Sequence, residues 1–433
     1  MKRLLTILLA CALMFSTVAC TASGDNQPTG EATKPTESQT QTNPTDTPTE
    51  PSKTPSGEYD TMNKVEMAAY ILDKAANADA NTMFSPLSLN MALGLVAEGA
   101  NPTYADLFEA LLDEKDYPAF AKQYMEYLDK LNADHSEDKY DKYKTVFEIA
   151  NSLWVDDKYE LTDAYLLATE PFSAEIDILS LADKTTAVNK INSWCAEKTR
   201  DMIKKVLAEE DLNAAAAAVA VNAVYFESPW LEEWYKLSAK ETFTRTDGTT
   251  EQFDAIKTTT VRYYENSKAT AFGCDYRNGL TFIGILPKEE GEFAVSDLDI
   301  ESLLNSQTNK YDVRATMPTL KFNNKIPISD ILKEMGCYSA LFGEDGIFDQ
   351  MVTQDGEQSF LTISKIIQCD AIELDEKGTK AAAVTAITMD NTAAIPNQKE
   401  YKEIKLDRPF AFAIYDSEMG QIVFIGKVVT TQQ

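Results

Sequence analysis

The residue types that support catalysis are unevenly represented, and the scarcest is histidine. The chain has one histidine, His135, within the polar stretch Asn132-Ala133-Asp134-His135-Ser136-Glu137. Serine and cysteine nucleophiles of the triad type need a histidine base, and multi-histidine zinc sites need several. A lone histidine among charged residues is typical of a solvated surface, so we expect neither. Catalysis by a pair of carboxylates is not excluded by the composition, because the chain has 69 Asp and Glu residues, but no spacing singles out a pair.

Four cysteines remain beyond the N-terminal segment, and none has the Cys-x-x-Cys spacing of a metal or redox site. An exported chain could form disulfides, but these residues are spread widely, which favours free buried thiols. Cys195 falls among helical positions and Cys369 in a strand, while the other two are Cys274 and Cys337. There is no phosphate-binding glycine loop. We therefore predict a protein that is not an enzyme and that holds no metal or cofactor.

The stretch Glu376–Ala383 connects an apolar strand, Ile366 to Leu374, with a long segment that reaches Pro409 without a capped helix or a hairpin. A loop of that length within a compact domain is usually functional or disordered. An alanine run alone would fit a helix equally well, because alanine has the highest helix propensity. Strand geometry predicts instead one uncharged face, Thr379, Ala381, Ala383, Thr385, Ile387 and Met389, opposite a face with Lys380, Ala382, Val384, Ala386, Thr388 and Asp390. The segment could thus be buried as a strand.

This stretch resembles the reactive-loop hinge of serpins, whose pattern is Glu-x-Gly-Thr-x-Ala-Ala-Ala. Glu376, Gly378, Thr379, Ala381, Ala382 and Ala383 stand at the fixed positions. Further segments from Tyr59 to Thr431 resemble the same family in order and spacing, although Trp234 stands where phenylalanine is usual and Ala411 is smaller than the usual residue. They are Asn81–Leu89, where Ser85 and Pro86 predict a helix start, the strands Ile149–Trp154 and Val221–Phe226 (with Trp230), the helix Ile191–Trp194, and the segments Asp407–Phe410 and Phe424–Val428.

The resemblance implies one α+β domain over residues 59–433, with the serpin fold: a large, mainly antiparallel central sheet, helices, and an exposed reactive loop in a metastable native state. It also implies suicide inhibition of serine proteases. A protease cleaves the loop and forms an acyl-enzyme, and the freed hinge then inserts into the sheet as a new strand. Residues that match the family's sheet-opening positions are Ser85, Ser88, Asn222 and Trp230, with Gln368 in place of the usual histidine. Because glutamine does not titrate, pH-tuned opening is not expected from this position. In the family Glu376 commonly pairs with a lysine directly after a proline; Thr319 follows Pro318 here, and Lys321 on the same strand face is a candidate substitute.

The cleaved bond is placed by counting along the loop. Seventeen residues from Glu376, as is usual in the family, place the reactive bond between Thr392 and Ala393. Counting back from Asp407 points near Gln398 instead; we favour the hinge count, because the inserted strand sets the distance travelled. The uncharged window from Asn391 to Ile395 suits an elastase-like or subtilisin-like protease. A trypsin-like protease would have to use Lys399 or Lys402.

The N-terminus predicts export and anchoring. Residues 1–19 form a signal peptide, and Thr17-Val18-Ala19-Cys20 resembles a lipobox with Cys20 as the lipidated residue. Ordinary signal cleavage near the same place is the alternative. The rest of segment 20–58 is a Thr/Pro/Ser-rich tether, which lacks large apolar residues between Thr21 and Gly57 and stays disordered. We expect a secreted protein that is lipid-anchored to the outer face of a bacterial cell membrane.

The net charge of the chain and the family resemblance each indicate which binding partners to expect. A formal net charge of -29 disfavours nucleic acid and anionic membrane surfaces. The implied partner is a target serine protease, bound as a covalent acyl complex, and the membrane is contacted only through the N-terminal lipid; we expect a monomer. Two alternatives stay open: a non-inhibitory serpin-fold binding or carrier protein, and a lipid-anchored solute-binding protein unrelated to serpins.

Overall fold

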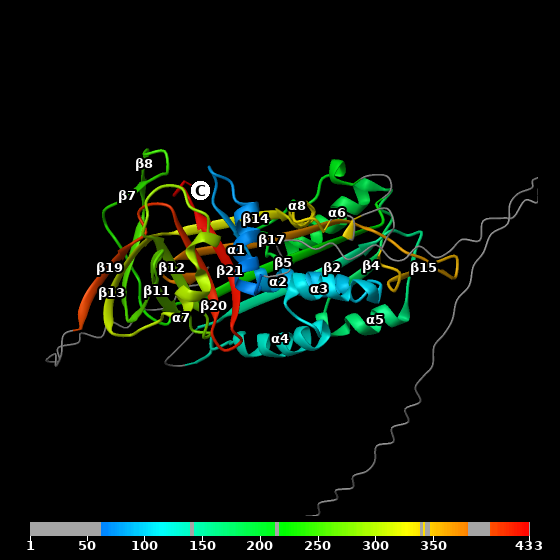
Figure 1. Ribbon diagram of the computed structural model, residues 1–433, viewed down its shortest axis with the longest axis horizontal. Helices are drawn as coiled ribbons and strands as arrows, with labels where there is room; N and C mark the ends of the chain where they lie inside the picture. Colours follow the sequence, from blue (N-terminus) through cyan, green and yellow to red (C-terminus); the bar gives the residue numbers. More distant parts are fainter. Residues whose placement is uncertain are drawn as a thin grey trace, which may run out of the picture. The chain divides into compact units, whose positions relative to one another are not determined.

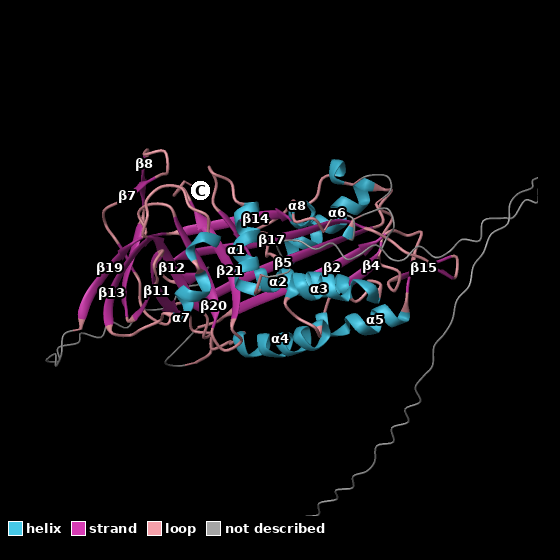
Figure 2. Cartoon of the chain, in the orientation of Figure 1, coloured by secondary structure: helices cyan, strands magenta, loops and turns pink. Residues whose placement is uncertain are grey.

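The computed structural model describes residues 62–138, 143–212, 216–337, 341–342, 347–379 and 399–432. The signal peptide, Cys20 and the tether lie outside these residues. The described part combines helices with β-sheets, which confirms the α+β class (Figures 1 and 2). Its α-helices are α1 Lys64–Ala75, α2 Pro86–Ala97, α3 Ala105–Leu112, α4 Tyr117–Leu131, α5 Asp163–Thr169, α6 Lys184–Lys198, α7 Ile300–Asn305 and α8 Ile328–Glu334. Four short 3-10 helices join them: η2 Pro102–Tyr104, η3 Glu170–Phe172, η4 Glu209–Asp211 and η5 Ser296–Leu298.

The large sheet contains the segments that the sequence singled out. Its strands in spatial order are β14 Leu320–Pro327, β17 Ile363–Asp375, β18 Gly378–Thr379, β5 Ala218–Pro229, β2 Val146–Val155 and β4 Glu175–Ile178. Neighbours run antiparallel except β17 with β5 and β2 with β4. The strands predicted around Ile149–Trp154, Val221–Phe226 and Ile366–Leu374 thus become β2, β5 and β17.

The remaining strands form smaller sheets. One holds β1 Thr82–Phe84, β21 Gln421–Val428, β20 Phe410–Asp416, β12 Thr281–Pro287, β11 Ala269–Asp275 and β10 Arg262–Glu265. Another holds β19 Glu400–Lys405, β13 Tyr311–Pro318, β9 Ala255–Thr260 and β6 Tyr235–Lys236. Short pairings join β16 Glu357–Gln358, β15 Val352–Gln354 and β3 Glu160–Leu161, and also β7 Glu241–Thr244 and β8 Thr250–Phe253.

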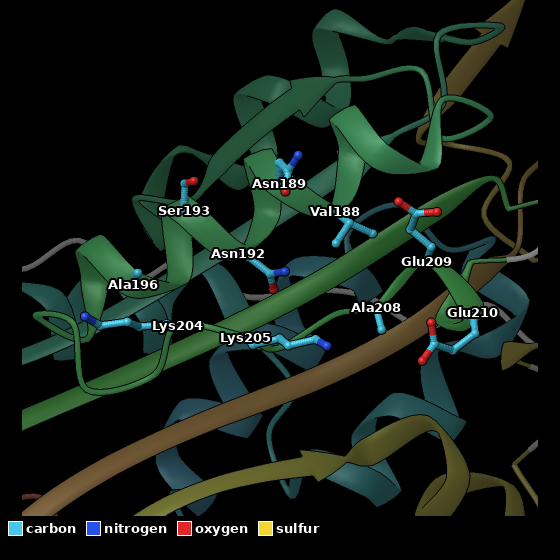
Figure 3. Close-up of a pocket in the computed structure, with 10 residues that line it drawn as sticks. All are labelled: Val188, Asn189, Asn192, Ser193, Ala196, Lys204, Lys205, Ala208, Glu209 and Glu210. Atoms are coloured by element: carbon cyan, nitrogen blue, oxygen red, sulfur yellow. The ribbon is translucent and has the colours of Figure 1, made fainter.

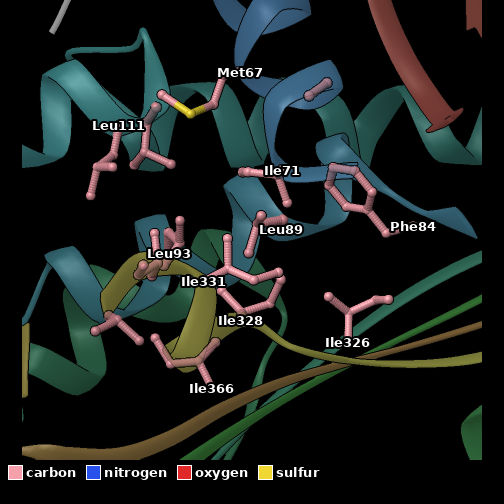
Figure 4. Close-up of a cluster of buried hydrophobic side chains, with 14 of the residues drawn as sticks. Met67, Ile71, Phe84, Leu89, Leu93, Leu111, Ile326, Ile328, Ile331 and Ile366 are labelled. Carbon is pink, nitrogen blue, oxygen red and sulfur yellow. The ribbon is translucent and has the colours of Figure 1, made fainter. Parts of the chain in front are cut away.

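Helices cover both faces of the large sheet. On one face, α6 packs on β5 and β17 in a cluster that includes Trp194, Cys195, Val221 and Cys369. On the other face, α2 and its neighbours form an apolar core with β14 and β17, seen in Figure 4 with Leu89, Ile326 and Ile366. Because β5 is buried on both faces, its sequence is an almost continuous apolar run.

The start of α2 is set locally by the sequence. Ser85 accepts a hydrogen bond from the Ser88 main-chain N–H at 3.2 Å, and Pro86 occupies the first turn, where no N–H is needed. This confirms the predicted helix start. It also fixes Ser85 and Ser88 against the sheet, since both are fully buried.

Candidate functional site

The hinge occupies the end of the large sheet as strand β18. Gly378 pairs with Asp375 of β17 and Pro229 of β5, and Thr379 pairs with Leu374 and Ser228. The chain therefore turns back at Glu376 and Lys377 and runs for two residues between β17 and β5. Ala381, Ala382, Ala383, Thr392 and Ala393 lie outside the described residues.

Gly378 is required by this turn. Its φ is +142°, a conformation that residues with a Cβ rarely adopt, and a Cβ there would lie 2.3 Å from the Ser228 carbonyl oxygen. A side chain at this position would push β18 away from β5. The glycine of the hinge pattern thus has a steric reason.

An aromatic pair holds Thr379 in the sheet. The Thr379 side chain is fully buried, and its hydroxyl is 2.9 Å from the hydroxyl of Tyr276. Tyr276 stacks on Trp230 with ring centroids 4.3 Å apart. Trp230 donates from its indole nitrogen to the Asp375 carbonyl at 2.9 Å and from its main chain to the Lys377 carbonyl at 3.2 Å. Burial raises the pKa of Tyr276, so its hydroxyl stays protonated.

Sequence reasoning found Trp230 but missed Tyr276. Trp230 belongs to a recognisable segment after β5, whereas Tyr276 follows β11 in no motif that we identified. The bridge between Trp230 and Tyr276 that joins the two segments exists only in the folded chain.

The residues at the family's other sheet-opening positions, Ser85, Ser88, Asn222 and Gln368, lie together beneath the sheet. The Ser88 hydroxyl donates to Asn222 Oδ1 at 2.8 Å, and Asn222 Nδ2 donates to Asn151 Oδ1 at 2.8 Å. Gln368 Nε2 donates to the Ser85 carbonyl at 2.7 Å. Because Gln368 and Asn222 are neighbours in the β17–β5 pairing, this group joins the two strands between which the hinge lies.

The same group contains two residues that the sequence did not indicate, Asn151 and Asp370. Asp370 is fully buried and accepts from Gln368 Nε2 at 3.3 Å. Burial raises its pKa well above the usual carboxyl range, although hydrogen bonds from Gln368 and the Ser85 main chain oppose the shift. Asn151 lies within the family-like segment Ile149–Trp154, but its place in this group follows from its register with Asn222 on β5.

Directly below the hinge the sheet is closed. The parallel pairing of β17 with β5 runs from Ile363 and Ala218 to Ala371 and Tyr225, and β18 begins beyond it. Beyond Ala371 and Tyr225 the two strands part, and Gly378 and Thr379 lie between them. We call the line of contact between β17 and β5 the seam.

One sequence suggestion does not hold. Lys321 was a candidate partner for Glu376, but its ammonium lies 3.5 Å from Glu373 Oε2. The β14–β17 register pairs Lys321 with Glu373, three residues before the turn.

The histidine and the cysteines considered for chemistry lie in different surroundings. His135 is exposed and stacks on Tyr143, and the four cysteines are buried and free, as expected. In the described ranges, no group of three or more His, Cys, Asp and Glu could hold a metal. None of the helices described is both long and apolar enough to cross a bilayer.

One surface hollow lies beside α6. It is open, has a volume of about 600 Å³, and lies between α6 and the segment that follows it (Figure 3). Asn192 ties the two walls, accepting from the main chain of Val206 and Leu207 and donating to the Leu207 carbonyl. The lining carries four charged side chains, Lys204, Lys205, Glu209 and Glu210.

Comparisons with known proteins agree with this geometry. The sequence model of the family described as "Serpin (serine protease inhibitor)" matches residues 62–431. The chain is 32% identical over 363 residues to an uncharacterized serpin-like protein of Methanosarcina acetivorans, covering 80% of this chain and 81% of that one. It is 28% identical over 370 residues to a serine protease inhibitor of Cyanea capillata, covering 81% and 92%.

Among solved structures, the native state of the thermophilic serpin tengpin matches with a TM-score of 0.72 and 26% identity, over 85% of this chain and 93% of that one. The chain therefore belongs to the serpin family, and its fold is the serpin fold. Members of this family are in general protease inhibitors rather than catalysts, and they pair with target proteases.

Proposed function

We propose that this chain inhibits serine proteases by cleavage of its loop, trapping of the acyl-enzyme and insertion of the loop into the large sheet. The observation that carries the proposal is β18, because Gly378 and Thr379 already lie between β17 and β5. Longer insertion would extend an existing pairing.

The register of β18 specifies where each inserted residue would go. Because β18 is antiparallel to both β17 and β5, each residue further along the loop would pair with a residue one position earlier on each of these strands. Ala383 would face Asp370, and Thr385 would lie between Gln368 and Asn222, which are neighbours now. The inward face is the uncharged one that begins with the buried Thr379. Small inward residues favour rapid insertion under the helices.

The length of the sheet supports the hinge count for the cleaved bond. An inserted strand that ran back along β17 to Ile363 would end at Asp390, two residues before Thr392. The protease serine would attack the Thr392 carbonyl carbon, form an ester, and release the amine of Ala393. Insertion of about 11 further residues, as far as Asp390, at about 3.4 Å each would then carry the ester by about 37 Å. That displacement would distort the protease before water hydrolyses the ester.

Hydrogen bonds supply the driving force. Each ladder bond contributes about 0.5 to 1.5 kcal/mol net, so ten or more bonds give on the order of 10 kcal/mol. The uncleaved chain cannot form them, because its loop stays connected to β19 at Glu400. The native state is therefore metastable.

The uncharged residues Asn391 to Ile395 favour an elastase-like or subtilisin-like target. Lys402 is a poor trypsin site, because it lies within β19, pairs with Val313 of β13 and forms an ion pair with Glu400 at 3.1 Å. Trypsin-like cleavage is therefore expected after Lys399, which is exposed. A protease bound as an ester at Lys399 would be joined to the inserted strand by about seven more residues than one bound at Thr392. Insertion would then not distort the protease, which would hydrolyse the ester and be released.

We further propose that the inhibitor acts as a monomer at the cell surface, held by a lipid on Cys20 and a tether of about 38 residues. A flexible tether keeps the loop within reach of diffusing proteases. Its lack of large apolar residues gives it no core of its own.

The proposal is tested by incubating the protein with elastase, subtilisin and trypsin and looking for complexes that survive SDS. Thr379→Arg is the informative variant, because an unpaired charge at this buried site costs several kcal/mol. Insertion should slow, and the variant should be cleaved as a substrate without trapping the protease. Lys377→Arg, at the exposed turn, is the matched control and should inhibit normally. Equal complex yields from Thr379→Arg and the parent would contradict loop insertion, and no complex with any protease would favour a non-inhibitory carrier.

A further inference from the structure

Three buried side-chain atoms in or beside the seam have no hydrogen-bond partner among the described residues. They are Asn151 Nδ2, Gln368 Oε1 and Asp370 Oδ2. Each belongs to the polar group beneath the sheet, and two lie on β17 at the line where it meets β5. Buried polar groups are normally paired, so this concentration needs an explanation.

Around Asp370 two hydrogen-bond acceptors remain unpaired, and one added proton would supply a donor between them. Gln368 Nε2 already donates to the Ser85 carbonyl and to Asp370 Oδ1. What remains is an acceptor on each side chain, Gln368 Oε1 and Asp370 Oδ2. An ionised carboxylate only accepts, whereas a protonated one carries an O–H donor. A single proton on Asp370 would therefore convert one of the two unpaired acceptors into a donor.

No cation faces Asp370 among the described neighbours. From β14 it meets Asn324, whose side chain bonds the Met83 N–H and the Asn81 carbonyl. From β5 it meets Val224, and from α2 the Ser85 main chain. The titratable group that acts on it is the Cys195 thiol of α6, which opposes ionisation.

The nearest lysine is directed elsewhere. Lys325 follows Asn324 in β14, so it points to the opposite face of the sheet, and its ammonium lies 3.4 Å from Asp211 Oδ2. Ionisation of Asp370 would thus leave a buried charge without an ion-pair partner. That situation costs several kcal/mol unless the group is solvated.

We propose that Asp370 is a proton-binding site that gates the seam: the protonated side chain holds β17 against β5, and loss of the proton favours their separation. The link to loop insertion rests on the proposed function, but the gating itself does not. In the inserted form, Ala383 would stand beside Asp370 and the Thr385 hydroxyl would reach the same polar group. Opening would also admit water to the carboxylate. Both changes stabilise the ionised form relative to the closed sheet.

The sign of the pH effect follows from the direction of the shift. In an open or unfolded state the carboxyl has a pKa of about 3.9, and in the closed sheet burial raises the pKa. The closed state binds the proton more tightly, so its stability is fully present below about pH 3.9. That stability is lost progressively as the pH rises towards the raised pKa.

The gating is tested without a protease, by hydrogen exchange of the β5 and β17 amides from about pH 5.5 to about pH 9. After correction for intrinsic exchange, the opening constant of the wild type should rise by up to about tenfold per pH unit and level off above the pKa of Asp370. Asp370→Asn keeps the shape and a donor, and it should change less than about twofold over the whole range. Asp370→Ala also removes the titration and serves if the asparagine variant does not fold.

Asp416→Asn is the matched control. Asp416 is another buried carboxyl, but the Tyr124 and Tyr127 hydroxyls donate to it in a different sheet. This variant should keep the wild-type slope at the seam. A wild-type seam that opens equally at every pH, or an Asp370→Asn slope equal to that of the wild type, would overturn the gate. Either result would leave loop insertion untouched, since complex formation with a protease is measured separately.

Discussion

Replacing Tyr276 with phenylalanine should release the hinge from the sheet. The change removes the hydroxyl that lies 2.9 Å from Thr379 Oγ1 and leaves the Thr379 hydroxyl buried without that partner. An unsatisfied buried hydroxyl costs about 1 to 3 kcal/mol. Since about 1.4 kcal/mol is a factor of ten, the fraction of molecules with β18 detached should rise by about 5-fold to 150-fold.

Cleavage by trypsin after Lys377 measures this detachment. Lys377 is exposed, but the following Gly378 is paired with both β17 and β5. The protease can therefore bind this bond only after β18 has detached from the two strands. When reclosing is faster than cleavage, the cleavage rate follows the detached fraction. Tyr276→Phe should therefore be cut about 5 to 150 times faster than the parent at that bond.

A double-mutant cycle separates the hydrogen bond from general damage. Thr379→Val also breaks the contact and should speed cleavage, but the double variant leaves neither hydroxyl unpaired and should fall below the sum of the two effects. Tyr263→Phe is the control, because its hydroxyl bonds Glu265 at 2.8 Å on β10, outside the large sheet. A Tyr276→Phe rate within twofold of the parent, or strictly additive single effects, would refute the idea that this bond seats the hinge.

Two further predictions concern the cleaved bond and the anchor. Mass spectrometry of the C-terminal peptide released in an elastase or subtilisin complex should find a fragment that starts at Ala393 or within about two residues of it, because the length of β17 limits insertion. A trapped trypsin complex with a fragment that starts at Glu400 would show that the extra loop residues lie on the hinge side. Cys20→Ser should move the protein from the membrane fraction to a soluble or unprocessed form, as measured by fractionation and immunoblot. A wild-type protein that is fully soluble without detergent would rule out the lipid anchor.

Much of the site was predictable because it is encoded in contiguous stretches. The hinge pattern, the capped start of α2 and the apolar runs of β5 and β17 are local signals, and each forms the expected element. The roles of Ser88, Asn222 and Gln368 came from a family resemblance rather than from residue chemistry. Hydrogen bonds of 2.8 Å from Ser88 to Asn222 and of 2.7 Å from Gln368 to the Ser85 carbonyl place these residues in one group, and their role in opening the sheet stays a prediction.

The parts that escaped prediction depend on register between distant strands. Lys321 was expected near Glu376, but the register of β14 with β17 places it opposite Glu373, with which it forms an ion pair. Tyr276 and Thr379 are 103 residues apart, and no pattern in either segment indicates that their hydroxyls meet. Asp370 is one of many acids in the sequence, and nothing local distinguishes it from a solvated one.

The family and the hinge pattern with its run of small residues follow from the sequence, because local patterns and composition carry that information. That two residues of the hinge already pair between β17 and β5, and that a carboxyl lies buried without an ion-pair partner at the seam, follows from the packed fold. The physical reason is that burial and pairing belong to a residue's neighbours in space. A charge such as that of Asp370 becomes consequential only when the packed sheet removes its water.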